Sequence, residues 1–197
     1  MAPRQRLPAA ARRRQILEAA AELVLQQGCL PLPLEALATR VGVSKGLIYG
    51  YFPTQADLFN ALLAEEHAAL AGAGLWAALD DGDLLASALA CADLYLDRLA
   101  ARGPLAHFIL RDAYMRGRLG AEGGRLRDRP LRAFARRVRR QLGLPSGEAL
   151  AAVLLVQAIP EEMGRLVWQG DVPLARGRDL TRQMVTSALG GLGSARG

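Results

Sequence analysis

The apolar residues of this chain recur at helical spacing along almost its whole length, and this periodicity constrains the fold more than any other feature. Side chains at i, i+3, i+4 and i+7 share one helix face, whereas no segment shows the alternation of a half-buried strand. Glycine, proline and capping residues separate nine predicted helices, at about 10–27, 34–41, 45–51, 55–74, 83–101, 104–117, 125–142, 146–169 and 177–190. We therefore predict an all-α fold, which the low aromatic content of 5% also favours.

Several classes of protein are disfavoured by what the 197 residues lack. No apolar run approaches the roughly 20 residues of a membrane-spanning helix, and no apolar stretch follows the N-terminal arginines as in a signal peptide. Cys29 and Cys91 lie far apart, and the only histidines are His67 and His107, so we expect neither disulfides nor a metal site. The sequence motifs of common hydrolases and nucleotide-binding enzymes are absent. We expect a cytoplasmic protein that is not an enzyme and holds no cofactor.

Charge is distributed unevenly along the chain. Seven basic and three acidic residues give residues 1–54 a net charge of +4, and two basic and eight acidic residues give residues 55–110 a net charge of −6. Eleven arginines and three acids then give residues 111–140 a net charge of +8. Lys45 is the only lysine among the 25 basic residues. The basic segment 1–54, called the basic head below, precedes an acidic segment, which indicates that the basic head binds a polyanion. Solvated basic faces are also common.

A helix-turn-helix is predicted in the basic head. The helix over 34–41 ends at Gly42, which allows a tight turn, and Ser44 is a favourable N-cap for the short helix over 45–51. In this motif the start of the second helix approaches the base edges in the DNA major groove. Lys45 stands at that start beside Gly46, whose missing side chain permits close approach.

Phosphate contacts are predicted for hydroxyl groups of the same segment. Tyr49 and Tyr51 can donate hydrogen bonds to phosphate oxygens, and Ser44 with the helix N-terminus adds further donors. A short aromatic helix beside a glycine turn can also be only a packed corner. The combination of cap, turn and basic arm favours DNA binding.

Residues 28–58, GCLPLPLEALATRVGVSKGLIYGYFPTQADL, carry these features at fixed spacings. The segment resembles the DNA-binding signature of the TetR family of transcriptional regulators. The elements that carry the resemblance are Leu37-Ala38, Gly42-Val43-Ser44, Ile48-Tyr49, Tyr51-Phe52-Pro53 and Asp57-Leu58. The resemblance implies an all-helical homodimer with a three-helix DNA-binding domain at residues 1–53, in which 1–9 form a flexible arm. It also implies an effector-binding and dimerisation domain at residues 54–197.

The resemblance assigns roles by position. It implies that Lys45 addresses bases, that Gly46 and Leu47 lie in the groove, and that Ser44, Tyr49 and Tyr51 hold the backbone. The chain departs from the family where a threonine often starts the second helix, because it has Leu32 followed by Pro33. It departs again where a lysine commonly starts the fourth helix, because it has Gln55. Each departure removes or weakens a phosphate contact, so DNA affinity would depend more on the N-terminal arm.

The arm and the first helix carry five arginines. Arg4 and Arg6 can follow phosphates or enter the minor groove, or they can form a solvated tail. For the helix-borne Arg12, Arg13 and Arg14 we favour phosphate contact.

If the resemblance to the TetR family holds, the last two long helices of each subunit form a four-helix dimer interface. The apolar residues expected there are Leu154, Leu155, Ala158, Met163, Leu166, Val167, Leu180, Met184, Ala188 and Leu189. Burial inside one subunit is the competing assignment. Pro160 lies within the first stripe, where it is expected to kink or divide the helix.

An effector site requires polar groups among aromatic residues inside a helical bundle. His107, Arg111 and Tyr114 are predicted to share a helix face. The other candidates are Phe108, Met115, Tyr95, Cys91, Trp76 and Trp168. Ordinary packing is the alternative for His107 and for both tryptophans.

The helix over 125–140 has apolar residues on one side and arginines largely on the other. The arginines predicted to lie on the polar side are Arg132, Arg136, Arg139 and Arg140. A solvated face is the favoured interpretation, and an anionic partner or a second nucleic-acid contact is the alternative.

Together these observations predict a homodimeric repressor that binds a near-palindromic double-stranded DNA operator and is released by a small-molecule effector. The alternative is a helical small-molecule-binding or protein-interaction module with weakened DNA binding. No membrane partner is expected.

Overall fold

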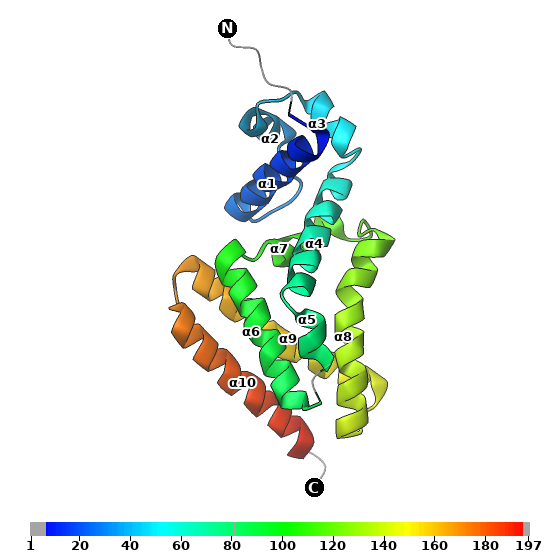
Figure 1. Cartoon of the computed structure of the whole chain (residues 1–197), viewed down its shortest axis with the longest axis vertical. Helices are drawn as coiled ribbons and strands as arrows, with labels where there is room; N and C mark the ends of the chain where they lie inside the picture. Colours follow the sequence, from blue (N-terminus) through cyan, green and yellow to red (C-terminus); the bar gives the residue numbers. More distant parts are fainter. Residues whose placement is uncertain (1–6, 81, 195–197) are drawn as a thin grey trace. The chain divides into compact units, whose positions relative to one another are not determined.

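The computed structural model describes residues 7–80 and 82–194, and the described residues are helical throughout apart from turns and loops. The first elements are α1 (Ala9–Gln27), α2 (Leu34–Val41), α3 (Lys45–Tyr51), α4 (Gln55–Gly72), α5 (Leu75–Asp80) and α6 (Leu84–Arg102). They are followed by α7 (Leu105–Arg111), the 3₁₀-helix η1 (Ala113–Met115), α8 (Ala121–Leu142), α9 (Ser146–Gln169) and α10 (Leu174–Ser194). The predicted all-α fold is confirmed (Figure 1).

One predicted helix is divided in the structure, and one helix of the structure was not predicted. The predicted helix 55–74 corresponds to α4, which ends at Gly72. The helix α5 follows Gly74 in a stretch where no helix was predicted, and the φ of Gly74, 101°, lies in a region that favours glycine. The segment 104–117 is divided into α7 and η1 at Asp112. Pro160, in contrast, does not divide α9, which is one helix from Ser146 to Gln169.

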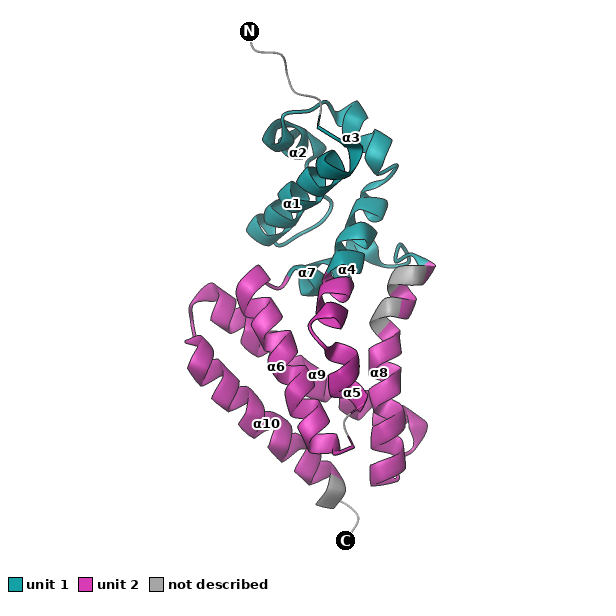
Figure 2. Cartoon of the chain, viewed as in Figure 1, with its two compact units in different colours: residues 1–65, 105–120 teal, residues 66–104, 121–197 magenta. Residues whose placement is uncertain are grey.

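The described chain forms two compact units, shown in teal and magenta in Figure 2. Unit 1 comprises residues 1–65 and 105–120, and unit 2 comprises residues 66–104 and 121–197. The division by packing therefore falls inside α4 rather than before it. The predicted functional division between residues 53 and 54 stays a prediction.

Unit 1 is built around one apolar cluster. The inner face of α1 supplies Ile16 and Leu17, which are fully buried, and α2 and α3 add Leu37 and Ile48. Later in the chain, α7 adds Ile109. Because α3 is only seven residues long, its stability depends on this packing more than on its own hydrogen bonds.

Unit 2 is a bundle in which α6 and α9 approach each other closely. A Cβ atom at Gly164 of α9 would lie 2.5 Å from Cβ of Leu99 on α6, so only glycine fits there. The core of unit 2 also takes Phe134 and Val138 from α8 and Val185 from α10. Small and branched residues thus set the helix spacing in unit 2.

No single described helix has the length and apolar character needed to cross a membrane, and one bent pair, Asp128–Leu142 with Ser146–Gln169, passes the same test jointly.

Candidate functional site

The turn between α2 and α3 has the geometry expected of a helix-turn-helix. Gly42 adopts φ 72°, and its amide donates to the carbonyl oxygen of Thr39 at 3.1 Å. The amide of Val43 donates to the carbonyl oxygen of Ala38 at 3.0 Å. These two bonds close α2 and redirect the chain into α3 within three residues.

The helix α3 has one buried side and one exposed side. Ser44 is its N-cap, and the Ser44 Oγ accepts a hydrogen bond from the amide of Leu47 at 3.2 Å. Ile48 is 1% exposed and packs into unit 1, whereas Leu47 and Tyr49 are 40% and 49% exposed. Because the packing of Ile48 fixes the orientation of α3, the opposite side of the helix stays exposed and can contact another molecule.

Lys45 forms an ion pair with Glu35 of α2 on this exposed side. The hydrogen bond and the charge of Lys45 lower the pKa of the Glu35 carboxyl, and Glu35 in turn raises the pKa of Lys45. Both groups are therefore ionised at neutral pH. The acidic residue beside Lys45 is a feature that the sequence analysis missed.

Gly46 and Gly50 lie on the exposed side of α3, where the protein itself leaves room for side chains. The nearest atom to a Cβ at Gly46 would be Ser44 Oγ at 3.9 Å, and a Cβ at Gly50 would meet nothing within 4 Å. Glycine within a helix costs about 1 kcal/mol relative to alanine. Packing in this chain does not account for either glycine.

The other residues predicted for DNA binding differ in exposure. Tyr51 is half-buried and packs against the core of unit 1. Arg13 lies over the Phe52 ring at 5.2 Å from its centroid and 3.9 Å from a Glu65 oxygen.

Arg12 Nη1 donates to Gln15 Oε1 at 2.6 Å, and Arg14 is exposed. Arg4 and Arg6 lie outside the described residues.

Gln55 stands where a lysine commonly starts the fourth helix in the TetR family, and it makes a different contact. Its side-chain oxygen accepts from the amide of Leu32 at 2.8 Å, and its side-chain nitrogen donates to the carbonyl of Leu32 at 2.9 Å. The first residue of α4 is thereby tied to the segment that precedes α2. A glutamine at this position has a structural role that the sequence analysis did not foresee.

The residues predicted for an effector site divide between the two units. His107, Phe108, Arg111, Tyr114 and Met115 belong to unit 1, and Trp76, Cys91, Tyr95 and Trp168 belong to unit 2.

The prediction that His107, Arg111 and Tyr114 share one helix face is wrong, because α7 ends at Arg111. Asp112 interrupts the helix, since its carboxylate accepts from the amides of Tyr114 at 2.8 Å and Leu30 at 2.9 Å.

Three of these residues contribute to packing within unit 1. Met115 is 1% exposed, and Phe108 packs against the same core. The Tyr114 ring meets Phe59 edge to face, with centroids 6.0 Å apart. These three side chains are therefore part of the packing of unit 1.

Tyr95 lies in a polar cluster within unit 2. Burial, with the nearby charges of Glu161 and Glu66, raises the pKa of the Tyr95 hydroxyl well above its usual value, and Gln157 hydrogen-bonds to it. The carboxylate of Glu66 accepts two bonds from Arg98, each 2.8 Å long. Tyr95 was predicted as an effector residue, whereas its polar neighbours were missed because they come from three different helices.

Cys91 lies one turn before Tyr95 on α6. Burial raises the pKa of its thiol to about 11, although the charge of Arg137 opposes this shift. Trp76 and Trp168 are more open, at 37% and 38% exposed, and the guanidinium of Arg129 stacks over Trp76 at 4.8 Å.

Apolar side chains remain exposed on α9 and α10 among the residues predicted for a dimer interface. Leu154, Leu155 and Met184 are 48%, 72% and 51% exposed. Ala158, Leu166, Val167, Leu180 and Ala188 are partly exposed. Met163 and Leu189 are buried within the subunit, which matches the competing assignment for these two residues. Met163 packs there because Gly177 leaves space for its side chain.

The fold and the exposed side of α3 are those of the class of helix-turn-helix DNA-binding proteins. Residues 16–62 match a family model described as bacterial regulatory proteins, tetR family. A search of curated protein sequences gives no significant match.

Solved structures share the fold over nearly the whole chain. A TetR-like transcriptional regulator from Rhodococcus sp. RHA1 is 21% identical with a TM-score of 0.71, covering 94% of this chain and 100% of its own. The TetR family regulator PfmR from Thermus thermophilus is 23% identical with a TM-score of 0.65, covering 88% and 96%. FadR from Bacillus subtilis, solved in complex with stearoyl-CoA, is 17% identical with a TM-score of 0.66, covering 93% and 99%.

Residues 16–62 therefore form a helix-turn-helix domain like those of the tetR family of bacterial regulatory proteins, and the chain shares its fold with solved TetR-family regulators.

Proposed function

We propose that the protein is a homodimeric repressor that binds a near-palindromic DNA operator and is released by a small-molecule effector. The observation that carries the DNA-binding part is the exposed start of α3, with Lys45 and Tyr49 on the side opposite the buried Ile48. The role proposed for this arrangement is regulatory.

The chemistry of the exposed side fits duplex DNA. Lys45 can donate to acceptors on base edges, and Gly46 and Gly50 allow close approach of the helix to the groove. Ser44 Oγ accepts from Leu47, so its proton remains available for a phosphate oxygen. Tyr49 supplies a second hydroxyl for the DNA backbone.

Dimerisation is supported by the apolar surface of α9 and α10. Leu154, Leu155 and Met184 would be removed from water if two copies packed these helices together. A two-fold dimer would present two copies of α3 to half-sites about 34 Å apart, one turn of DNA.

An effector site is proposed within the predicted domain 54–197, at the polar cluster around Tyr95. A buried hydroxyl beside charged groups can recognise a polar ligand atom. The structure of FadR from Bacillus subtilis with stearoyl-CoA supports a small molecule as the type of effector. An effector that favoured the non-binding arrangement by about 1–3 kcal/mol would release DNA usefully.

The test is binding of the full-length protein to the DNA upstream of its own gene, measured by mobility shift. The double variant Lys45→Ala, Tyr49→Ala is expected to lose the shift because it loses one base contact and one phosphate contact per subunit. The affinity of the natural protein should fall with added salt as counterions are released.

The control is Arg118→Ala, an exposed arginine that lies over the Tyr114 ring, outside the helix-turn-helix. Unchanged binding by the double variant, or a complex that salt does not weaken, would refute this proposal.

A second candidate function is a helical binding module with weakened DNA affinity. It is favoured by Glu35, whose negative charge lies beside Lys45, and by Gln55, whose side chain is engaged with Leu32. Absence of a mobility shift from a folded dimer would favour this candidate.

A further inference from the structure

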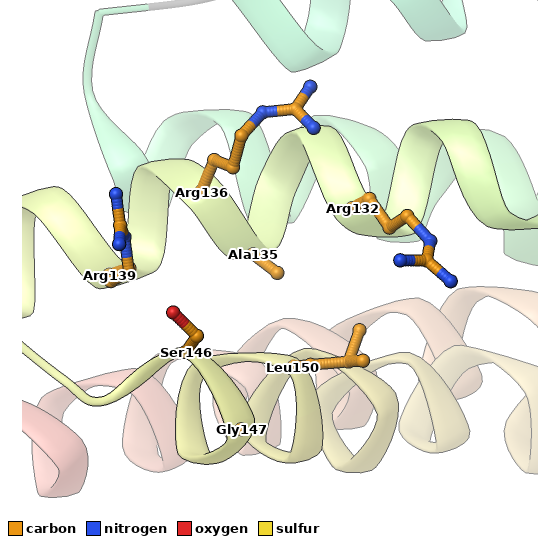
Figure 3. A pocket seen from close by; sticks show the side chains of 7 residues that line it. All are labelled: Arg132, Ala135, Arg136, Arg139, Ser146, Gly147 and Leu150. Atoms are coloured by element: carbon orange, nitrogen blue, oxygen red, sulfur yellow. The ribbon is translucent and has the colours of Figure 1, made fainter.

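A groove runs between α8 and α9 in unit 2, apart from the residues proposed above for DNA, effector and dimer contacts. Its volume of about 440 Å³ lies within the roughly 300–1,000 Å³ typical of small-molecule sites. It is lined by Arg132, Ala135, Arg136, Arg139, Ser146, Gly147 and Leu150 (Figure 3).

Three arginines of α8 give the groove a basic lining, although the Arg136 side chain is turned away from α9 (Figure 3). Arg132, Arg136 and Arg139 are spaced i, i+4 and i+7, which places them along one side of the helix. Arg132 has an acidic partner, since its Nη2 lies 3.5 Å from Asp128 Oδ2. Within the described residues, no carboxylate pairs with Arg136 or Arg139. Like charges at this spacing repel one another, and a bound anion would relieve the repulsion.

Apolar surface separates the charged ends of the groove. Figure 3 shows Arg132 and Arg139 towards opposite ends, with Ala135 and Leu150 between them. Seven helical residues correspond to about 10 Å along α8. The groove therefore offers charge at its ends and apolar contact in its middle.

The end near Arg139 has additional hydrogen-bond donors. Ser146 is the first residue of α9, and its hydroxyl is directed towards α8 in Figure 3. Pro145 precedes it as the N-cap and makes no side-chain cap hydrogen bond, so the amides of the first turn lack that partner. Arg136 is exposed and turned away from α9 in the figure, and it can reach a ligand by a change of rotamer.

We propose that this groove binds a small organic anion. A phosphate or carboxylate group lies against Arg139 and Ser146, and an apolar group of the same molecule covers Ala135 and Leu150. Guanidinium groups bind both phosphate and carboxylate in this way. The proposal does not depend on DNA binding, and it adds a ligand site that is separate from the polar cluster around Tyr95.

The probe is phenyl phosphate, which combines a dianion with a flat apolar ring, and inorganic phosphate serves as the matched anion without the ring. Binding to the full-length protein is measured by calorimetric titration at low salt and without DNA. We expect phenyl phosphate to bind about tenfold more tightly, or more, because only it covers the apolar floor. Equal affinity for the two anions, which would indicate attraction to surface charge alone, or no binding of phenyl phosphate at millimolar concentration, would overturn the proposal.

Two variants locate the site. Arg139→Gln should weaken phenyl phosphate binding by about tenfold, whereas Arg140→Gln removes the same charge from the next residue and should leave binding within about twofold. Equal losses in the two variants would overturn the assignment.

Gly147→Leu keeps every charge but fills the groove, since a Cβ at Gly147 meets nothing within 4 Å. It should abolish the preference for phenyl phosphate over inorganic phosphate. A retained preference in this variant, with unchanged helical circular dichroism, would also count against the groove. If Gly147→Leu loses helicity, the comparison of Arg139→Gln with Arg140→Gln alone decides whether the groove is the binding site.

Discussion

The two units of this protein both have an apolar core, but they differ in whether polar side chains are buried with it. Among the described residues, the buried polar side chains are Glu66, Ser87 and Thr181, all in unit 2. Unit 1 instead buries a continuous apolar cluster and carries its polar groups on the exposed side of α3.

This difference fits the tasks proposed for the two units. An apolar interior fixes the orientation of α3, so that the polar groups on its surface are held in place for a partner. The buried polar groups of unit 2 can recognise a small molecule, and the exposed apolar residues of α9 and α10 can recognise a second copy of the chain. The predictions below test this contrast, beginning with the largest expected effect.

The first prediction concerns the apolar exterior of unit 2. The double variant Leu155→Glu, Met184→Glu should weaken dimerisation by about a thousandfold or more, roughly 4 kcal/mol, because it places four like charges in one interface. Analytical ultracentrifugation measures the change. The matched control is Leu47→Glu, an exposed leucine of unit 1 that should leave the dimer intact. Dissociation by Leu47→Glu, or a stable dimer of the double variant, would contradict the contrast.

The second prediction compares two adjacent glutamates. Glu66 is 6% exposed and holds Arg98 through two hydrogen bonds, whereas Glu65 is exposed and lies 3.9 Å from Arg13. Glu66→Ala should lower the free energy of unfolding by about 3 kcal/mol because it leaves a half-buried guanidinium unpaired. Glu65→Ala should lower it by less than about 0.5 kcal/mol. Urea unfolding followed by circular dichroism would refute the distinction if the two losses were alike.

The third prediction uses one cysteine from each unit. Cys29 is exposed in unit 1, and Cys91 is partly buried in unit 2 with its pKa raised from 9.0 to about 11. The raised pKa disfavours the thiolate, so at pH 8 the reactive fraction of Cys91 should be about a hundredfold lower than for an unperturbed thiol. Alkylation followed by mass spectrometry should modify Cys29 first, and Cys91 should react faster as the pH rises towards 11. Rapid reaction of Cys91 at pH 8 would show that the interior of unit 2 is open there.

The smallest effect is expected at the surface of unit 1. Glu35→Gln removes a negative charge beside Lys45 and should raise DNA affinity about threefold at moderate salt. The lowered pKa of Glu35 and the raised pKa of Lys45 keep both groups ionised, so the gain should be constant between about pH 6 and pH 8. Glu22→Gln, which removes an exposed charge beside Arg40, is the control for fluorescence anisotropy measurements. A decrease in affinity would instead mean that Glu35 positions Lys45 for DNA.

The features that the sequence predicted well are local ones. The sequence pattern Thr54-x-x-Asp57 is typical of a capping box, and the two residues exchange hydrogen bonds of 3.0 and 3.1 Å between amide and side chain at the start of α4. Gly42 ends its helix in the left-handed conformation, as expected, and Gly28 does the same at the end of α1. Each of these depends on residues within one turn of the helix, which lie together in the sequence.

The features that the sequence missed depend on distant partners. Asp112 interrupts a predicted helix while its carboxylate binds Leu30, which is 82 residues away. Glu66 and Arg98 are separated by 32 residues, and neither position has a local signal for pairing. The candidate effector residues between His107 and Met115 are neighbours in the sequence and belong to unit 1, whereas Trp76, Cys91, Tyr95 and Trp168 belong to unit 2, and no local spacing indicates this division.

The sequence by itself determined the all-helical fold, the ends of the helices that carry clear caps and the helix-turn-helix, because caps, turns and amphipathic spacing act over a few neighbouring residues. Only the tertiary structure decided which polar side chains are buried together and which apolar ones remain exposed. Those outcomes depend on which helix faces pack against each other, and packing brings together residues that no short stretch of sequence connects.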